Sequence, residues 1–263
     1  GSKGVHIAVP RERIGNRDAL TLVSPVDGRV MFCLPAGPHA IIGTTDTWTT
    51  ESPESVKAGE ADVDYLIRSA NHYFPRAALT PRDIVSAWAG IRPLASGAAA
   101  RPGRISREHS IVTDSGVINV TGGKLTTYRS MAAEIVDVAE RALRRKPRGA
   151  ATDSVPLPGA ERRTALTGLQ HDDPALSAVL APGLPYTGAD LVYAVREEMA
   201  TTLSDLLIRR THLAFETRDH GQSVAARAAA IVAPLLGWSD DVKSARLREY
   251  LHDVERMFTI VPR

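Results

Sequence analysis

The sequence has little cysteine, few aromatic residues and no long apolar segment, and each shortage excludes a class of protein. A single cysteine, Cys33, among 263 residues excludes an internal disulfide framework and a cysteine-rich zinc site. No apolar run approaches the ~20 residues that span a bilayer, and the amino terminus has no signal-peptide pattern. Aromatic residues make up 5% of the chain, and no basic stripe interleaved with them indicates nucleic-acid binding. The composition is that of a soluble globular protein and fits a reducing cytosol.

Glycine-rich nucleotide fingerprints are also missing. No Gly-x-Gly-x-x-Gly follows a predicted strand, and no Gly-x-x-x-x-Gly-Lys-Ser/Thr occurs. An intact dinucleotide-binding start and a P-loop are therefore both excluded. His6, His39 and His109 have no metal-ligand spacing, so the sequence predicts no metal site. Cys33 lies in an apolar run, which predicts a buried side chain without catalytic reactivity.

Charge is divided unevenly along the chain. The net charge is +2, but residues 1–150 carry a net +5 and residues 151–263 a net −3. An anionic ligand is therefore expected in the first half. The difference is too small to indicate a nucleic-acid partner.

The first half of the sequence predicts an antiparallel sheet, because short apolar runs follow one another with turn residues between them. These runs are Val5–Val9, Ala19–Val23, Arg29–Leu34 and His39–Thr45. Apolar residues at helical spacing predict a helix over 60–73. Two further extended segments are predicted over Asp83–Leu94 and Ser106–Val112, separated by a loop of small residues.

The second half of the sequence predicts one strand–turn–helix unit and then helices only. Gly116–Val120 indicates a strand, Gly122–Gly123 a tight turn, and Lys124–Lys146 an amphipathic helix. A linker is predicted over 147–164, followed by helices over 188–211, 222–236 and 239–258. The predicted class is α+β, divided into an antiparallel sheet domain at 1–113, a strand and helix at 114–146, the linker at 147–164 and an all-α domain at 165–263.

The strand–Gly-Gly–Lys–helix pattern predicts binding of an anion or a cofactor. Helix amino termini present unpaired N–H groups and a partial positive charge. Gly122 and Gly123 allow a ligand to approach the backbone, and Lys124 adds a full charge at the same place. The alternative is a glycine turn beside a solvated lysine.

Two arginines flank the loop of small residues and form a second candidate site. Arg92 precedes a proline and is expected to be extended, and Arg107 lies in the next extended segment. If the two segments pair in a hairpin, both guanidinium groups can bind one carboxylate or phosphate. Surface ion pairing is the alternative for each arginine.

The remaining candidates carry weaker signals. Ile41–Asp46 places two hydroxyls and a carboxylate at a strand end, which can line a pocket or form an ordinary turn. His6 is interpreted as a strand histidine with satisfied hydrogen bonds, and a role in proton transfer is the alternative. The charged helix in the second half predicts structural ion pairs among Glu197, Glu198, Asp205, Arg209 and Arg210.

Five ordered segments together resemble the flavin-dependent glycerol-3-phosphate dehydrogenases and oxidases, within the D-amino-acid-oxidase-like superfamily. They are Lys3-Gly-Val-His-Ile-Ala-Val-Pro10, Ile41-Ile-Gly-Thr-Thr-Asp46, Gly90-Ile-Arg-Pro-Leu94, Ser106-Arg-Glu-His109 and Gly122-Gly-Lys-Leu-Thr-Thr-Tyr-Arg129. The resemblance implies that residues 1–113 form a substrate-binding sheet domain and that residues 114–146 are the terminal strand and helix of an FAD-binding domain. The helices after residue 188 resemble the family's carboxy-terminal domain.

The resemblance implies that hydride passes from carbon 2 of sn-glycerol-3-phosphate to FAD, which yields dihydroxyacetone phosphate. Arg92 and Lys124 are implied as catalytic residues, and Arg107 and Thr45 join them in binding the substrate. Contact with the cofactor is implied for Gly90, Ile91, Gly122, Gly123, Lys124, Leu125 and Thr126.

The resemblance also implies electron transfer to a membrane quinone and a cytoplasmic protein peripheral to the inner face of the cell membrane. The helical domain is a candidate surface for homodimer contacts. Because the family's glycine fingerprint is missing, we expect this chain alone to bind FAD weakly and to be inactive. An oxygen-using glycerol-3-phosphate oxidase is the near alternative. The other alternative is a binding or regulatory module that keeps the fold without flavin.

Overall fold

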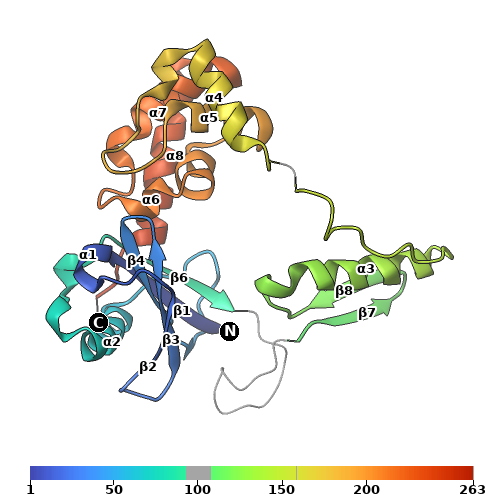
Figure 1. Ribbon diagram of the computed structural model, residues 1–263, viewed down its shortest axis with the longest axis horizontal. Helices are drawn as coiled ribbons and strands as arrows, with labels where there is room; N and C mark the ends of the chain where they lie inside the picture. The colour runs from blue at the N-terminus through green and yellow to red at the C-terminus, as the bar shows by residue number, and fades with distance from the viewer. Residues whose placement is uncertain (93–107, 158, 263) are drawn as a thin grey trace. The chain divides into compact units, whose positions relative to one another are not determined.

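The computed structural model describes residues 1–92, 108–157 and 159–262. The chain divides into two compact units (Figure 1). The larger comprises residues 3–46, 51–91 and 161–263, and the smaller comprises residues 1–2, 47–50 and 92–160. The larger unit holds most of an antiparallel sheet and the carboxy-terminal helices, whereas the smaller holds a hairpin and one long helix. The predicted α+β class is confirmed.

The sheet has the strand order β2-β3-β4-β1-β5, with β6 also paired to β1. The antiparallel register pairs His6 of β1 with Gly43 of β4, and Phe32 of β3 with the same glycine. The predicted strands of the first half are confirmed, with bounds shifted by a few residues. The observed strands are β1 (Ser2–Pro10), β2 (Leu20–Val23), β3 (Val30–Ala36), β4 (His39–Gly43), β5 (Thr47–Trp48) and β6 (Ser86–Arg92).

One face of this sheet forms a hydrophobic core with α2 (Glu60–Tyr73), the helix predicted over 60–73. Side chains alternate between the two faces of a strand, so every second residue of β1 and β4 points to this core. Cys33 is fully buried there, as predicted. Burial raises the pKa of its thiol to about 11, which removes thiolate reactivity at neutral pH. The cluster includes Val5, Ile7, Val9, Met31, Cys33, Ala40, Ile42, Val63, Leu66, Ile67, Ala70 and Ala87.

Short elements connect the sheet strands. The α-helix α1 (Arg11–Ile14) follows β1, and the 3-10 turns η1 (Pro75–Ala77) and η2 (Pro81–Asp83) precede β6. The extended segment predicted from Asp83 therefore begins later, at Ser86. Thr80 and Asp83 explain this, because the Asp83 side chain accepts hydrogen bonds from the Thr80 backbone N–H and hydroxyl and holds a helical turn there.

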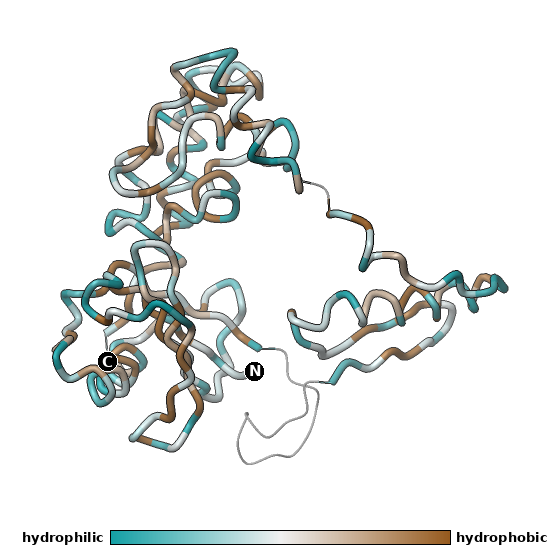
Figure 2. The backbone as a smooth tube through the Cα atoms, in the orientation of Figure 1, coloured by the Kyte–Doolittle hydropathy of each residue, from teal (hydrophilic) through white to brown (hydrophobic). Residues whose placement is uncertain are grey.

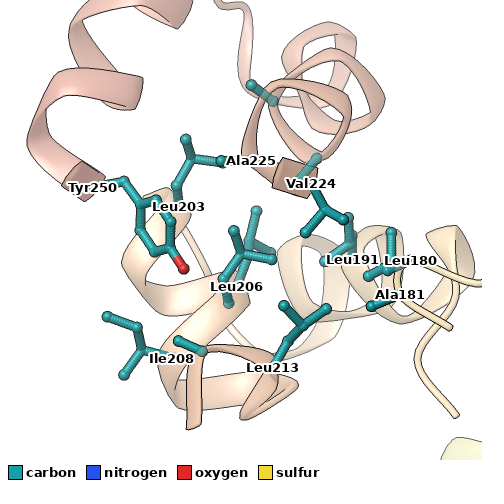
Figure 3. Packing of buried hydrophobic residues seen from close by; sticks show 14 of the residues in the cluster. Leu180, Ala181, Leu191, Leu203, Leu206, Ile208, Leu213, Val224, Ala225 and Tyr250 are labelled. Atoms are coloured by element: carbon teal, nitrogen blue, oxygen red, sulfur yellow. The ribbon is translucent and has the colours of Figure 1, made fainter. Parts of the chain in front are cut away.

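The carboxy-terminal helices form a second hydrophobic core within the larger unit (Figure 3). Leucines from several elements meet at its centre, and Leu191, Leu206 and Leu213 are fully buried. The elements are α4 (Arg162–Asp172), η5 (Pro174–Ser177), α5 (Gly188–Glu197), the π-helical turn η6 (Asp205–Arg210), α6 (Leu213–Glu216), α7 (Gln222–Leu236) and α8 (Asp240–Phe258).

The single helix predicted over 188–211 is wrong, because α5 ends at Glu197 and the chain turns before η6. Met199 adopts the left-handed conformation at φ 60°. Asp205 then accepts hydrogen bonds from the backbone N–H groups of Thr201 and Thr202, at 3.1 and 3.0 Å. Capping by a side chain starts a new helical segment here, a signal that the continuous apolar spacing conceals.

The smaller unit contains the hairpin β7 (Ser110–Asp114) and β8 (Val117–Thr121), followed by the 3-10 turn η4 (Leu125–Thr127) and α3 (Tyr128–Ala142). Hydrophobic residues recur along α3 (Figure 2), yet none of its residues is buried. Arg144, at φ 57°, follows the end of this helix, whereas the sequence predicted that it continued to Lys146.

The domain boundaries predicted at 113 and 164 remain predictions. The first falls within the β7–β8 hairpin, and α4 begins at Arg162, inside the predicted linker. Within the described residues, no helix has the length and hydropathy needed to cross a membrane.

Candidate active site

The Gly122–Gly123 turn connects β8 to η4, and its glycines are favoured by the protein's own backbone conformation. Their φ angles of 74° and 91° lie in the left-handed region, which confirms the predicted turn. A Cβ atom at Gly122 would lie 2.5 Å from the Glu108 carbonyl oxygen, and one at Gly123 would lie 2.3 Å from Cε of Met131. The backbone contact therefore excludes a side chain at Gly122 even without a ligand, whereas at Gly123 the flexible Met131 side chain can move and the positive φ is what favours glycine.

The residues after this turn are open to solvent. Lys124 is extended, and α3 begins four residues later than predicted, at Tyr128, because η4 intervenes. The Thr127 hydroxyl donates a hydrogen bond to the Lys124 carbonyl oxygen at 3.0 Å. Lys124 and Thr126 are exposed, and Leu125 is 88% exposed. The turn thus presents a cation and an uncovered apolar side chain on one short segment.

An ion pair connects the chain before β7 to α3. Nε2 of His109 lies 2.8 Å from the Glu134 carboxylate. Because Gly122 also packs against Glu108, residues 108–109, the glycine turn and α3 form one local unit. The lysine is therefore presented from a fixed turn.

Arg92 ends β6, where its Nη1 donates a hydrogen bond to the Ser2 hydroxyl at 3.4 Å. The hairpin considered between the two arginine segments is not formed by their described parts, because β6 pairs with β1 and β7 pairs with β8. The consecutive order of the strands does not reveal this choice of partners. Arg107 lies outside the described residues. Gly90 has no atom within 4 Å of an added Cβ, and Ile91 beside it is half-buried.

His6 lies across Gly43 on the face of the sheet opposite the α2 core. A Cβ atom at Gly43 would lie 2.2 Å from Cδ2 of His6. The His6 ring also stacks on Trp88, with ring centroids 5.7 Å apart and an angle of 14° between the planes. Glycine within a strand signals a close approach, so the sequence contained a signal for this contact. Strand alternation places Arg92 on the same side of β6 as Trp88.

Aromatic contacts continue from Trp88 into the carboxy-terminal helices. Trp88 meets Phe215 of α6 edge to face at 4.9 Å, and Phe215 meets Phe258 of α8 at 5.0 Å. The Ser86 hydroxyl donates a hydrogen bond to the Phe215 carbonyl oxygen at 2.6 Å. Nothing in the local sequence predicts these contacts, since they join residues that lie far apart in the chain.

Thr45 and Asp46 are held by the surrounding sheet. Thr45 is 3% exposed, and its hydroxyl oxygen accepts a hydrogen bond from the Val5 N–H at 3.0 Å. Asp46 is also buried and pairs with Arg29, with 2.6 Å between Oδ2 and Nη1. These contacts match the ordinary-turn interpretation, and substrate binding by Thr45 remains a prediction.

The predicted ion pairs of the carboxy-terminal half are partly confirmed. Arg209 lies 2.8 Å from Asp205, and Arg210 lies 4.0 Å from Glu198. Arg162 joins the second pair from α4, at 3.5 Å from Glu198. Within the part of the chain that the structure describes, no group of three histidine, cysteine, aspartate or glutamate side chains is arranged to hold a metal ion.

The sheet, the glycine turn and the helical region match two family models. Residues 1–136 match the FAD dependent oxidoreductase family, and residues 163–243 match the C-terminal domain of alpha-glycerophosphate oxidase. The chain therefore belongs to the FAD dependent oxidoreductase family. The first match includes the glycine turn and most of α3.

Individual relatives within this family show which enzymes the chain is similar to. Glycerol-3-phosphate dehydrogenase 2 of Mycobacterium tuberculosis is 34% identical across 97% of this chain and 48% of its own length. Glycerol-3-phosphate dehydrogenase of Synechocystis is 32% identical across 97% of this chain and 53% of its own length. The chain thus spans about half the length of the curated relatives it matches.

A solved structure shares the fold. It is the glycerol-3-phosphate dehydrogenase from Bacillus halodurans complexed with FAD, which has a TM-score of 0.74 and 27% sequence identity, covering 97% of this chain and 57% of that one. The exposed Lys124, Leu125 and Thr126 fit a cofactor of this kind, because they offer a cation, an apolar surface and a hydroxyl on an uncovered segment.

Proposed function

We propose that this chain belongs to an enzyme that oxidises sn-glycerol-3-phosphate to dihydroxyacetone phosphate with FAD. The observation that carries the proposal is the exposed Gly122–Lys124 turn before α3, inside a family match that begins at residue 1. The named relatives and the FAD-bound neighbour support the substrate and the cofactor.

The reaction removes two electrons and two protons from the substrate. The C2–H bond breaks as hydride leaves, the C2 hydroxyl loses its proton, and the C2–O bond becomes a carbonyl. FAD, when bound, supplies the hydride acceptor. The Lys124 ammonium group would stabilise negative charge that develops on the C2 oxygen, a role that a preorganised cation performs best away from water.

The substrate phosphate needs cationic partners, and Arg92 is the described residue proposed for it. Its guanidinium already donates to a neutral hydroxyl on Ser2, and a phosphate offers it stronger, charge-assisted bonds. Arg107 and Thr45 complete the proposed substrate set. Gly90, Ile91 and the segment Gly122–Thr126 form the proposed flavin contacts.

The exposed apolar face of α3 supports the proposal that α3 belongs to a cofactor-binding domain completed by another part of such enzymes. Tyr128, Val136 and Leu143 are 54%, 55% and 66% exposed, although their spacing is that of a helix which buries one side. The curated relatives are about twice as long as the matched region. We therefore assign this face to contact with the half of such enzymes that the chain does not span.

A membrane quinone is the proposed electron acceptor, with the enzyme peripheral to the inner face of the cell membrane. Oxygen is the second candidate, because residues 163–243 match a domain described for alpha-glycerophosphate oxidase. Turnover of the intact enzyme with a water-soluble quinone in the absence of oxygen distinguishes the two. If turnover requires oxygen, the enzyme is assigned as an oxidase and not as a dehydrogenase.

The assignment of Arg92 and Lys124 is tested by kinetics of the intact enzyme. Lys124→Ala is expected to lower kcat by about 10² to 10³, the usual loss of one charge-stabilising group. Arg92→Ala is expected to raise KM for glycerol-3-phosphate and to lower kcat/KM by a similar factor, and Arg92→Lys to recover only part of it. Arg141→Ala, an exposed residue near the end of α3, is the matched control. Normal kinetics in both site variants would contradict the assignment.

A further inference from the structure

A pocket of about 260 Å³ lies on the outer face of the sheet beside Trp88. Small apolar residues of β1, β3 and β4 form its base. Trp88 and Phe215 form aromatic walls, while His39, His212 and Glu216 contribute polar groups. All these residues belong to the larger unit, so the pocket is a feature of one compact body. Its volume suits a ligand smaller than a typical cofactor.

Two residues that line this pocket carry a buried polar atom without a hydrogen-bond partner. They are Nδ1 of His39 and Oε2 of Glu216. The His39 residue is only 8% exposed. Buried polar atoms in proteins are almost always paired, because an unpaired one loses its hydration without compensation. Two unpaired atoms around one pocket indicate a missing hydrogen-bonding group.

A group that donates hydrogen bonds fits both residues. A glutamate carboxylate only accepts. Burial, and then the charge of Arg218, lower the pKa of His39, which favours the neutral ring, and in the tautomer with its proton on Nε2 the unpaired Nδ1 accepts. A ligand with several N–H groups satisfies both residues.

Charge and wall chemistry favour a cation. The pocket is lined by one carboxylate and by no lysine or arginine, so a cation is favoured over an anion. The Trp88 and Phe215 rings, 4.9 Å apart and inclined at 79°, offer aromatic surface, which attracts organic cations. A metal ion is disfavoured, since no three metal-ligating side chains come together in the described residues.

We propose that this pocket binds a small organic ammonium ion, with N–H groups donating to Glu216 and His39 and an apolar body against Trp88 and Phe215. Both acceptor atoms are enclosed in the structure, so binding includes a side-chain rotation toward the ligand. The site lies on the sheet face that carries His6, next to the His6–Trp88 stack. It is independent of the redox reaction proposed above and requires no flavin.

Three probes of similar shape test the ligand class on the 263-residue chain. Benzylammonium, benzyl alcohol and benzoate differ in charge and in donor number. The readout is the NMR signal of the Trp88 indole N–H, identified through its loss in Trp88→Phe, with calorimetry for affinity. Benzylammonium is expected to shift this signal and to bind about tenfold or more tightly than the alcohol, since charge-assisted hydrogen bonds are the stronger ones. Benzoate is expected not to bind.

Variants test the site itself. Glu216→Gln keeps the side-chain shape and is expected to weaken benzylammonium binding by about tenfold or more. Glu197→Gln, an exposed carboxylate on α5, is the matched control and is expected to bind normally. Circular dichroism confirms that both variants fold. Equal affinity for all three probes, no shift of the Trp88 signal, or unchanged binding by Glu216→Gln would each overturn the proposal, and the pocket would then hold water only.

Discussion

Helices α5 and α7 of the carboxy-terminal region have apolar spacing similar to that of α3, but only α5 and α7 bury their apolar faces. In the helical core, α5 and α7 bury most of their apolar side chains, and Leu206 and Leu213 have no exposed surface. In α3 the equivalent pattern leaves every residue at least partly exposed. Amphipathic spacing therefore identifies a face that requires cover, and the rest of the fold decides whether this chain provides it.

The largest contrast is expected between Leu206→Ala and Leu143→Ala. Leu206 is fully buried, so truncation creates a cavity and is expected to lower the free energy of unfolding by about 2–5 kcal/mol. Leu143 is 66% exposed, so its truncation is expected to change stability by at most about 0.5 kcal/mol. Urea unfolding of the chain measures both. A large loss from Leu143→Ala would show that α3 is covered in the chain by itself.

A second contrast compares two glycines in the left-handed region. Gly221 has φ 74°, and an added Cβ would lie 2.8 Å from Cδ2 of Leu213 and 2.9 Å from Oη of Tyr250. Gly116 in the β7–β8 turn has φ 81° and no atom within 4 Å. Gly221→Ala is expected to cost about 2–4 kcal/mol, from strain plus overpacking, and Gly116→Ala about 1 kcal/mol from strain alone. Equal losses in thermal unfolding would mean that packing around Gly221 relaxes freely.

The smallest expected effect on stability concerns Glu216 and Asp205, two carboxylates within the helical region. Burial raises the pKa of Glu216, against a hydrogen bond from Tyr186 and the charge of His212. Burial also opposes ionisation of Asp205, but hydrogen bonds from Thr201 and Thr202 outweigh it and lower its pKa.

The raised pKa of Glu216 and the lowered pKa of Asp205 predict opposite dependences of stability on pH. The contribution of Glu216 to stability is fully present below the ordinary glutamate pKa and is lost as pH rises through its raised folded value. The contribution of Asp205 is present above the ordinary aspartate pKa and is lost as pH falls through its lowered folded value.

At neutral pH, Glu216→Gln is therefore expected to stabilise and Asp205→Asn to destabilise, each by on the order of 1 kcal/mol. Both differences are expected to vanish in acid. Melting curves from acid to neutral pH measure this, and differences of the same sign for the two variants would contradict the pKa directions.

Much of the fold follows from local sequence, and the exceptions have physical causes. The strands of the first half, α2 and the glycine turn are set by short-range alternation, periodicity and turn residues. The break after α5 depends on one aspartate cap hidden inside an apolar pattern. The pairing of β6 with β1 is non-local, so no spacing reveals it.

The candidate functional residues also divide into those that local motifs predict and those that only tertiary packing brings together. Local motifs identify Arg92, Lys124 and the glycine turn. Trp88, Phe215, His39 and Glu216 come together only through tertiary packing between the sheet and α6. They carry no local motif, and their unpaired polar atoms become visible only in the structure.

The central claim is that the Gly122–Lys124 segment serves a flavin that oxidises glycerol-3-phosphate. The most direct measurement is anaerobic reduction of the flavin in the intact, FAD-loaded enzyme, followed by the loss of its visible absorbance after glycerol-3-phosphate is added. We predict rapid bleaching in the wild type, slowed by about 10² or more in Lys124→Ala and unchanged in Arg141→Ala. A flavin that stays oxidised in the wild type, or that bleaches equally fast without Lys124, would contradict the claim.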